Sequence, residues 1–599
     1  MKIPLPLFFI TFGPLVLFFL SFSSLFAQDK GDHIWLFGYA RFIDTNPIFG
    51  SCYMDFNELP VTVGAGYWGV DFDMTDASIC NQDGELQLYT NGNSIINGQH
   101  EILENGDGLN PNGTLGFNEG LSLIQGAVVL PRPENESAYF ILHEGFFIVQ
   151  LPSTPVITCN PFYYSEVDLS ANNGLGAVVK KNEILINDTL DGGKIVATRH
   201  ANGRDWWAVV PQYGTNGFYR ILVDPEGVHN MGVQEVGVPM VDGLGQAQFS
   251  PDGSKYVHLS LKHFTVNYLN IYDFDRCTGE LSNHVQYFFD SNIGAGGVAI
   301  SPNSRFLYLI EPQRIFQFDL WASDIISTKT EVAVYDGYEE AIPLSTDTLL
   351  APVQFFLGQL APDGKIYINV PFITVRAMTV IEYPDKKGLG CQVRQHSFHL
   401  PTLNQFSMPN FPNYRLGPLD GSPCDTLGID NTPMAKFRYE QDTLDFLQVE
   451  FTDLSYYEPA EWSWDFGDNT TSQDTSPVHI FPQGGTYEVC LTVSNVNGEH
   501  TFCRTLELGT VSTAEEAELV TITVFPNPCR DGVNFILSDY LPRDAKVVLY
   551  DAVGQLLKTQ SVQTGWNTVR LDGLPTGIYF YEIWEREVRL DRGKLMKVE

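Results

Sequence analysis

The chain has 599 residues, more than one hydrophobic core usually organises, so its length predicts two or more domains. The composition, with 53 Gly, 35 Pro and 13% aromatic residues, is typical of globular proteins rich in short strands and turns, and unlike that of coiled coils or disordered chains. The 72 Asp and Glu against 35 Lys and Arg give a net charge of -37, which would repel polyanions. We therefore expect no nucleic-acid partner.

The N-terminus predicts an export signal. Lys2 precedes a long apolar run that ends in small and polar residues at Ala27. The run is long enough for a retained membrane anchor, but its three prolines and the Ala27–Gln28 junction favour cleavage. We expect residues 1–27 to be a signal peptide and the mature chain to have no stable membrane span. The nine cysteines of an exported chain permit disulfide bonds and leave at least one thiol unpaired.

A turn followed by a short apolar strand recurs along residues 28–424, as in "NQDGELQLYTNG", "SPDGSKYVHLS" and "APDGKIYINV". The predicted strands begin near His33, Glu85, Ala138, Asp205, Lys255, Arg305 and Lys365, at separations of 50 to 67 residues. A period of this length, with several short strands in each unit, is typical of propeller blades. We predict an all-β protein that begins with a seven-bladed β-propeller over residues 28–424. We also predict that the N-terminal "HIWLFGY" closes the ring by pairing with the last blade, since closure protects edge strands.

The stretch "RHANGRDWWAVVP" contains the candidate catalytic residues His200, Arg204 and Asp205. It occupies the turn-then-strand position of the other repeats, but this polar trio is absent from their turns, which is what a site added to one blade looks like. The trio either holds the turn or acts in binding or catalysis. We favour the first role, with the two adjacent tryptophans packing between blades. The chain has no GxSxG elbow, so a serine nucleophile has no local support.

Three turns are rich in oxygen ligands, at residues 71–76, 105–113 and 273–279. Such ligands suit calcium, but none of the turns has the spacing of a twelve-residue calcium loop. HExxH and paired CxxC motifs are absent, so a zinc site has no local support. We predict no metal site and no cofactor. Calcium is the one ion that the oxygen ligands of these turns would suit, although no turn has a full calcium motif.

A second module is expected at residues 434–510, where apolar and polar residues alternate between Gly, Pro and Asn turns. The pattern predicts a small β-sandwich. Its "WSWDFGDNTTS" followed by "PVHIFPQGGTYEVCLTVSN" resembles a PKD domain, an immunoglobulin-like module built around Trp-Asp-Phe-Gly-Asp. The resemblance implies an extracellular spacer or adhesive module without catalysis of its own.

Cys490 and Cys503 lie on two alternating strands of this module, and we predict that they form a disulfide bond. A loop at residues 495–498 would place the two cysteines opposite each other, at a distance that a disulfide accepts. A two-residue hairpin at Asn497 and Gly498 would instead place Cys490 opposite Thr505 and leave both thiols without this partner. Export to an oxidising compartment favours the first register.

The C-terminal residues 521–599 predict another small β-sandwich, with strands that meet at Gly-containing turns. The motifs "PNP", "DAVGQLL", "LPTGIYF" and a closing "GKLMK" resemble the type A sorting domain of the type IX secretion system in Bacteroidota. The resemblance implies recognition by that secretion machinery, removal of the domain, and release or anchoring of the rest at the cell surface. We expect cleavage in the polar linker at residues 511–520.

Stretches such as "GKIVATRHANGRDWWAVVP", "YDFDRCTGELS" and "MPNFPNYRLGPLDGSPCDTLG" resemble the uncharacterised propeller region found ahead of PKD and sorting domains in such surface proteins. This resemblance covers most of residues 31–428 and implies no particular reaction. We therefore expect an extracellular protein, secreted or anchored at the outer cell surface. Its propeller would serve binding or adhesion, with a glycan or a surface protein as partner. The alternative is an enzyme, a polysaccharide-acting hydrolase or lyase with two carboxylates at the propeller mouth.

Overall fold

The computed structural model of the chain describes the residues 30–38, 48–66, 68–111, 120–150, 155–239, 245–261, 266–290, 295–343, 348–371, 374–404, 406–442, 445–508, 521–525, 529–530, 532–538, 545–551, 556–563, 565–585 and 588–598. The expected signal peptide at 1–27 and the linker at 511–520 lie outside the described residues, as does the "PNP" motif.

The N-terminal part of the chain is built almost entirely of short antiparallel strands. The first twelve are β1 (Ile34–Gly38), β2 (Ser51–Asp55), β3 (Thr62–Gly66), β4 (Ala77–Cys80), β5 (Leu86–Thr90), β6 (Ser94–Asn97), β7 (Ile102–Asp107), β8 (Ala127–Pro131), β9 (Ala138–Gln150), β10 (Pro155–Asp168), β11 (Ala177–Ile186) and β12 (Leu190–Asp191). They form one sheet of order β1-β2-β3 and a nine-stranded sheet of order β4-β5-β6-β7-β11-β10-β9-β8, in which β12 pairs with β10.

The following strands repeat one simple pattern of four strands in sequence order. They are β13 (Val196–Arg199), β14 (Trp206–Pro211), β15 (Gly217–Asp224), β16 (Gly227–Glu235), β17 (Ala247–Phe249), β18 (Lys255–Leu261), β19 (Val266–Asp275), β20 (Glu280–Asp290), β21 (Gly297–Ile300), β22 (Phe306–Glu311), β23 (Arg314–Asp319), β24 (Thr330–Val334), β25 (Glu339–Pro343), β26 (Thr348–Pro352), β27 (Gly358–Leu360), β28 (Ile366–Ile368), β29 (Val375–Ile381) and β30 (Val393–Asn404). Strands β13–β16, β17–β20, β21–β24 and β27–β30 each form one sheet, and β25 and β26 form a hairpin.

Local turn chemistry explains why these strands begin where they do. Each of the predicted strand starts lies within one residue of an observed one, at β1, β5, β9, β14, β18, β22 and β28. Gly253 and Gly364 precede two of these strands with φ of 71° and 78°, a conformation that glycine adopts without steric cost. The turns that precede these strands therefore locate the strand starts of the repeat, as predicted.

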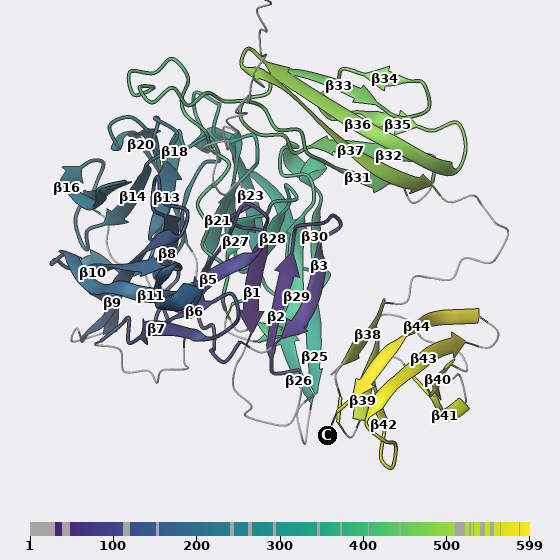
Figure 1. The fold of residues 1–599 in the computed structure, drawn as a ribbon. Helices are drawn as coiled ribbons and strands as arrows, with labels where there is room; N and C mark the ends of the chain where they lie inside the picture. The colour runs from purple at the N-terminus through teal and green to yellow at the C-terminus, as the bar shows by residue number, and fades with distance from the viewer. Residues whose placement is uncertain are drawn as a thin grey trace, which may run out of the picture.

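The sheets pack face to face around a ring, which makes this part of the chain a β-propeller (Figure 1). On one side of the β1–β3 sheet, the Trp35 ring lies 5.9 Å from the ring of Tyr367 in β28. On the other side, Leu36 packs in one cluster with Tyr89 of β5. The number of blades stays a prediction, because one sheet joins eight consecutive strands edge to edge and another is a two-stranded hairpin.

The prediction that β1 pairs with the last blade is wrong. Strand β1 pairs with β2 and is the edge of its own sheet, with Trp35 opposite Met54. The ring closes by side-chain packing instead, since Trp35 and Met54 share a buried cluster with Met378 and Leu400 of the β27–β30 sheet. Apolar contacts between sheet faces thus take the place of a shared strand.

Two smaller β-sandwiches follow. The middle sandwich consists of β31 (Phe437–Gln441), β32 (Gln448–Asp453), β33 (Glu461–Asp465), β34 (Thr471–Ser472), β35 (Val478–Ile480), β36 (Gly485–Asn495) and β37 (Gly498–Leu508). Its sheets are β31-β32-β35 and β34-β33-β36-β37, and Trp464 and Phe466 lie in the core between them. The aromatic residues of the "WSWDFGD" motif therefore pack in the core, as expected.

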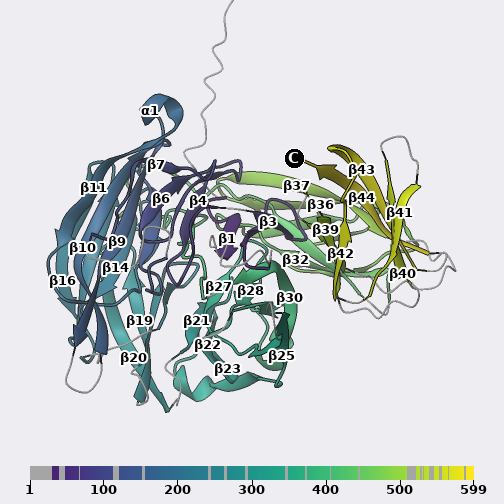
Figure 2. The same cartoon turned by 90° about the horizontal axis from the view of Figure 1, so that it is seen from below.

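The C-terminal sandwich lies apart from the middle one in Figure 1, and the two overlap in the view of Figure 2. Its strands are β38 (Thr521–Phe525), β39 (Gly532–Ser538), β40 (Ala545–Tyr550), β41 (Leu556–Ser561), β42 (Gly565–Arg570), β43 (Gly577–Glu585) and β44 (Val588–Lys597). The helices of the described residues are the short turns α1 (Ala171–Gly174), η1 (Ile326–Thr328) and η2 (Gly388–Cys391). None of these has the length or the apolar character of a membrane span.

Candidate functional site

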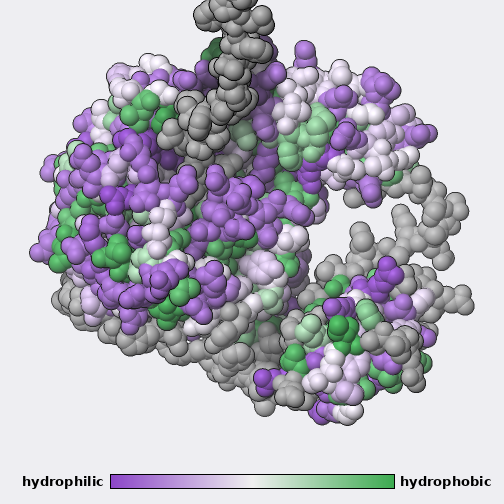
Figure 3. Space-filling model, viewed as in Figure 1, coloured by the Kyte–Doolittle hydropathy of each residue, from purple (hydrophilic) through white to green (hydrophobic). Residues whose placement is uncertain are grey.

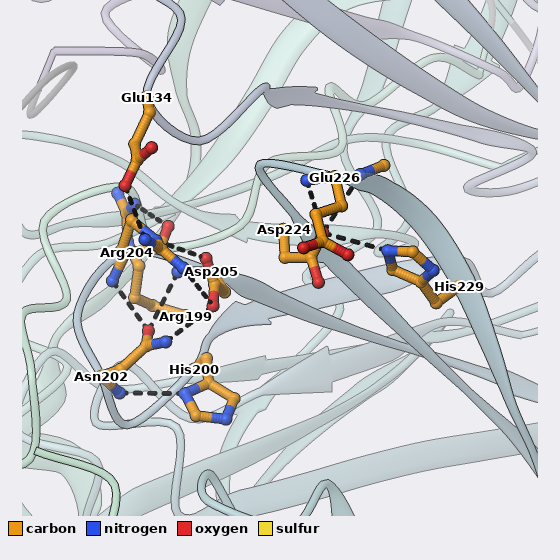
Figure 4. A network of polar contacts seen from close by, with 10 residues as sticks. Glu134, Arg199, His200, Asn202, Arg204, Asp205, Asp224, Glu226 and His229 are labelled. Atoms are coloured by element: carbon orange, nitrogen blue, oxygen red, sulfur yellow. Dashed lines mark hydrogen bonds and ion pairs between the residues drawn. The ribbon is translucent and has the colours of Figure 1, made fainter. Parts of the chain in front are cut away.

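His200, Arg204 and Asp205 lie in the turn between β13 and β14, where they bind one another and the turn itself (Figure 4). Asn202 Nδ2 donates to Asp205 Oδ2 at 2.7 Å, and Asn202 Oδ1 accepts from the backbone N–H groups of Arg204 and Asp205 at 3.0 Å. Arg204 Nε donates to Asp205 Oδ1 at 2.8 Å, and Arg204 Nη1 pairs with Glu134 at 2.6 Å. His200 Nδ1 accepts from the Asn202 N–H at 3.0 Å. The structure thus brings the three candidates together.

The surroundings of this cluster favour a structural role. Burial lowers the pKa of His200, so the neutral imidazole is the form that accepts the Asn202 hydrogen bond. The imidazole stacks on Trp207 with ring centroids 5.7 Å apart. Trp206 packs on the opposite side, with its ring 5.8 Å from that of Tyr414. Both tryptophans are buried, as predicted. We interpret the cluster as a set of hydrogen bonds that holds the β13–β14 turn in one conformation, rather than as a catalytic site. We call this set the turn lock.

The oxygen-rich turns make their own hydrogen bonds. In the turn before β4, Asp73 accepts a hydrogen bond from the hydroxyl of Ser122. In the β19–β20 turn, Asp275 Oδ1 accepts from the Cys277 N–H at 2.7 Å. Part of the turn at 105–113 lies outside the described residues. Among the residues that the structure describes, no group of three or more His, Cys, Asp and Glu side chains is placed to hold a metal ion.

The axis of the propeller is filled by residues 406–419, which we call the axial segment. Asn410 lies at its centre and is buried. The Asn410 side-chain amide donates to the carbonyl oxygens of Ala127 and Ile195 at 2.9 and 2.8 Å, and its backbone N–H donates to that of Asp76 at 2.9 Å. One asparagine therefore ties together strand β8 and the residues that directly precede strands β4 and β13.

Tyr414 and Arg415 extend these contacts toward the end of the axis. The Tyr414 hydroxyl donates to the Val129 carbonyl at 2.9 Å, and its side chain is 1% exposed. The Arg415 guanidinium forms two hydrogen bonds with Asp32, at 2.6 and 2.7 Å. The segment continues to Cys424, which is disulfide-bonded to Cys277 of the β19–β20 turn. No signal in the sequence pointed to this segment, because it has neither a repeat pattern nor strand periodicity.

The middle sandwich docks on the propeller at the end of the axis. Arg438 Nη2 donates to the Glu382 carbonyl at 2.8 Å, and Lys365 Nζ lies 3.5 Å from Glu440. Leu454 lies against Gly364, whose position leaves no room for a side chain. The PKD resemblance implies a spacer, and in the structure this module is docked on the propeller.

A junction pocket of about 200 Å³ lies where the propeller, the axial segment and the middle sandwich meet. Its wall includes two carboxyl groups, those of Asp32 and Asp453. Asp32 is held by Arg415, while Asp453 accepts hydrogen bonds from Trp462 Nε1 at 2.8 Å and from the Ser455 N–H at 3.1 Å. Burial raises the pKa of Asp453. Both carboxyl groups are therefore hydrogen-bonded to protein groups, Asp32 to the axial segment and Asp453 within the middle sandwich.

A second pocket, which we call the rim pocket, has a volume of about 460 Å³ and lies between strand β20 and the neighbouring β21–β24 sheet. Its wall consists of Tyr287, Phe288, Phe289, Glu311, Arg314, Phe316 and Lys329. Strand β20 is the edge strand of its sheet. Because side chains alternate along a strand, Tyr287 and Phe289 face the neighbouring sheet, with rings 6.0 Å apart, while the ring of Phe288 remains 57% exposed.

Two of the charged groups of the rim pocket come from the β22–β23 hairpin, and the third, Lys329, directly follows η1. Glu311 ends β22 and Arg314 begins β23, and the register places them opposite each other. The Glu311 carboxyl group makes no hydrogen bond or ion pair with any other described residue, and its burial raises its pKa to about 7. Arg314 pairs with Glu331 at 3.3 Å, and Lys329 Nζ lies 3.8 Å from the ring centroid of Phe316. Glu311 is therefore a half-buried acid that faces a pocket without a protein partner.

Sequence reasoning missed the rim pocket. A signal was present in "QYFFD", because three consecutive aromatic residues on one strand must place at least one ring on each face. On an edge strand, one of these faces is open. The hairpin "IEPQRIF" also shows Glu311 and Arg314 at a turn, but nothing local indicates that β20 lies beside it.

The cysteines of the middle sandwich are joined in the structure. Cys490 and Cys503 are directly opposite in the β36–β37 ladder and form a disulfide bond, with Cα atoms 4.1 Å apart. The ladder follows the first of the two registers, and Asn495 is the last residue paired, opposite Gly498. Among the described residues, Cys52, Cys80, Cys159, Cys391 and Cys529 are free and buried.

Two segments of the chain match known domain families. Residues 432–509 match the PKD domain, and residues 523–593 match the secretion system C-terminal sorting domain. No curated protein matches the chain.

Several solved structures are similar to parts of the chain. The PKD1 domain of the Vibrio cholerae metalloprotease PrtV is 27% identical over 13% of this chain and 98% of that chain, with a TM-score of 0.12. A putative 6-phosphogluconolactonase from Bacteroides uniformis is 10% identical over 72% of this chain and 99% of that chain, with a TM-score of 0.27. A quinonprotein alcohol dehydrogenase-like protein from Bacteroides thetaiotaomicron is 13% identical over 63% and 75%, with a TM-score of 0.30. These low TM-scores carry no inference about activity.

The family matches agree with the sequence motifs and with the two sandwiches. The chain is a β-propeller protein with a PKD domain and a type IX sorting domain, and the sorting domain indicates secretion to the outer surface of the cell.

Proposed function

We propose that this protein is a surface or secreted binding protein whose propeller presents a ligand site at the rim pocket. In this proposal, residues 28–424 form the binding unit, residues 434–510 form the docked PKD module, and residues 521–599 are the part removed at export. The observation that carries it is the Glu311 carboxyl group, which lies in the wall of the rim pocket and makes no hydrogen bond or ion pair with another described residue. A pocket whose wall combines aromatic side chains with a few polar groups is the usual form of a ligand site.

The space-filling view supports a specific pocket over a broad adhesive face. On the face shown in Figure 3, hydrophilic residues predominate over the propeller and hydrophobic ones are scattered among them. Single exposed hydrophobic residues are ordinary on soluble proteins, whereas large apolar patches mark interfaces. A ligand held by a few well-placed groups therefore suits this surface better than a large apolar contact.

The alternative of a hydrolase or lyase at the propeller mouth has less support. That chemistry needs two carboxyl groups facing a substrate across an open mouth. At the sandwich end of the axis, Asp32 and Asp453 are hydrogen-bonded to protein groups, and the axial segment occupies the space between the inner strands. We therefore favour binding.

The test is a binding screen of the secreted protein against glycans and against intact cells. The double variant Glu311→Ala/Arg314→Ala should lose at least tenfold in binding, because it removes the acid and the base that lie opposite each other in the pocket wall. Glu280→Ala is the matched control, since Glu280 is an exposed acid at the other end of β20. Binding by the double variant at the wild-type level would refute the proposal.

A further inference from the structure

We propose that the sorting domain binds the secretion machinery through one outer face, the surface of the sheet β41-β40-β43-β44 that points away from the propeller. We call this surface the outward face. The proposal is independent of the rim pocket, because it concerns export of the precursor and not the ligand of the propeller. The family match implies that the machinery recognises residues 523–593, but it leaves open which surface is recognised. A β-sandwich has two outer faces, and the structure distinguishes them.

The outer face of the sheet β38-β39-β42 lies against the propeller. Phe535 and Leu537 of β39 point into the core of the sandwich, so Ile536 between them points outward, yet it is only 8% exposed. Trp566 is opposite Ile536 on β42 and packs against a buried propeller cluster that includes Ile342 of β25. Figure 1 and Figure 2 both show this sheet on the propeller side of the sandwich. We call it the docked face, and it is less available to a partner.

The outward face carries an apolar patch. Strand β43 directs Tyr579 into the core, so Ile578 and Phe580 on either side of it point outward, with exposed fractions of 41% and 44%. The register places Met596 of β44 beside Ile578, and Tyr550 of β40 beside Phe580. Apolar and aromatic side chains of three adjacent strands are thus contiguous. A contiguous apolar patch on a soluble domain is typical of an interaction site.

Basic residues border this patch. Arg592 and Lys594 are exposed on β44 and point to the same side as the patch. Glu582, the acid beside them, accepts hydrogen bonds from two neighbouring side chains at 3.0 and 3.1 Å. Residues 521–599 contain ten Lys and Arg and ten Asp and Glu, so the net charge of -37 belongs to residues 1–520. The outward face therefore fits a protein with an apolar surface bordered by acidic groups, which the rest of the chain would repel.

The motifs of the sorting domain lie on the same sheet. The stretch "LPTGIYF" leads into β43 and "GKLMK" ends β44, and the register pairs the two stretches, with Gly577 opposite Lys597. The stretch "DAVGQLL" connects β40 with β41. The sequence features that make this domain resemble other sorting domains are therefore gathered, as far as the structure describes them, on the sheet that bears the outward face.

A second copy of this chain is the competing partner. Many homodimers pair the same apolar surface of two subunits around a two-fold axis. Such pairing would bring the basic borders of two identical faces together, which like-charge repulsion opposes. The net charge of -37 on each chain opposes it further. The machinery is therefore the favoured partner, and the two partners give different products in a cross-linking experiment.

The experiment places a photo-cross-linking amino acid at Phe580 of the full chain in a host that exports the protein. Irradiation should link the precursor to a protein of the type IX machinery, identified by mass spectrometry. The matched probe at Trp566, on the docked face, should link to propeller residues of the same chain. A Phe580 probe that yields a dimer of this protein, or no link to the machinery while export proceeds, would overturn the proposal. A machinery product from Trp566 alone would overturn it as well.

Variants test whether export needs the outward face. Ile578→Asp/Phe580→Asp places two charges on the apolar patch and should lower export about tenfold or more, with uncleaved precursor retained in the cell. Trp566→Ala is the matched control, because it removes an apolar side chain from the docked face of the same domain, and its export should stay within about twofold of the wild type. Export of Ile578→Asp/Phe580→Asp at the wild-type level would overturn the proposal.

A charge variant keeps the test valid if the first variant fails to fold. The melting temperature of the retained precursor shows whether the sandwich is intact. Arg592→Glu/Lys594→Glu changes only exposed side chains and should lower export about fivefold, because it reverses the charge that borders the patch. Wild-type export of this folded variant would show that the basic border has no role in recognition and would overturn the proposal.

Discussion

The axis and the rim of this propeller use polar residues in opposite ways. On the axis, Asn410 and Tyr414 direct their side-chain donors to carbonyl oxygens of the inner strands, and Arg415 is paired with Asp32. At the rim, Glu311 is partly buried but has no hydrogen-bonding partner among the described residues. These three axial side chains are thus hydrogen-bonded within the protein, while the rim retains a group that a ligand can satisfy.

This difference shows that the hydrogen-bonding partners of a polar residue indicate its function better than its place in the sequence does. The His200 cluster looked like chemistry in the sequence, yet its members hydrogen-bond to each other and to their own turn. Glu311 looked unremarkable in a hairpin, yet its hydrogen-bonding capacity is unused. The Glu311 carboxyl group lies in a pocket wall, where a ligand can reach it.

The largest effect is expected on the axis. Tyr414→Ala should lower the free energy of unfolding of the propeller by about 3–5 kcal/mol, as is usual when a large buried aromatic side chain is removed. Chemical denaturation of the full chain, followed by tryptophan fluorescence, measures the change. Tyr414→Phe is the matched control and should cost only about 1 kcal/mol, the worth of the hydrogen bond to Val129.

If Tyr414→Ala and Tyr414→Phe were equally stable, the axial segment would not be a structural part of the propeller. The comparison with the rim would then fail, because both regions would carry polar groups that stability does not require.

The next effect concerns the middle sandwich. Replacing both Cys490 and Cys503 by Ser should lower its free energy of unfolding by about 3 kcal/mol, since the disulfide closes a short loop in the unfolded chain. Thermal unfolding of the full chain, in which this transition is identified by its sensitivity to reductant, measures the loss. A double variant that unfolds at the wild-type temperature without reductant would contradict this prediction.

The sequence predicted those features that local chemistry determines. The turn residues before β5, β14, β18 and β28 mark the strand starts, because Gly, Asn and Asp permit conformations that other residues avoid. The opposition of Cys490 and Cys503 also followed from the alternation of two adjacent strands. The signal peptide stays a prediction, since it lies outside the described residues.

The axial segment and the rim pocket could not be predicted, because both depend on contacts between distant parts of the chain. Asn410 reaches Ala127 and Ile195 across 283 and 215 residues, and it lies in an irregular segment without periodicity. Phe288 and Glu311 are closer in sequence, but they belong to different sheets, and only the packing of those sheets makes a pocket between them. Sequence patterns encode strands more directly than they encode which sheets touch.

A smaller effect is expected for the turn lock. Asp205→Ala should lower the free energy of unfolding by about 1–3 kcal/mol, because the buried Asn202 amide and the Arg204 guanidinium lose their acceptor. His200→Ala should have a smaller effect, of about 1 kcal/mol, through its contact with Trp207. Ligand binding at the rim should be unchanged in both variants. Loss of binding in His200→Ala at an unchanged melting temperature would show that this cluster, and not the rim, is the functional site.

The smallest effect is the pH dependence of the rim pocket. Burial raises the pKa of Glu311 to about 7, the positive charges of Lys329 and Arg314 act to lower this pKa, and the negative charge of Glu331 acts to raise it. Over this range the carboxyl group changes from mostly protonated to mostly ionised, and the ionised form accepts stronger hydrogen bonds. Binding of a ligand that donates hydrogen bonds to Glu311 should therefore become about threefold tighter between pH 6 and pH 8.

Stability should change in the opposite direction over the same range. A carboxyl group whose pKa is higher in the folded than in the unfolded protein stabilises the fold below its unfolded pKa, and this contribution is lost as the pH rises through about 7. The wild type should thus lose stability between pH 6 and 8 as it gains affinity, and Glu311→Gln should remove this part of both changes, since Gln does not titrate. Titrations and denaturation curves at pH 6, 7 and 8 for the two proteins measure this directly. If the affinity and the stability of the wild type and of Glu311→Gln changed with pH in the same way, Glu311 would not be the group that contacts the ligand.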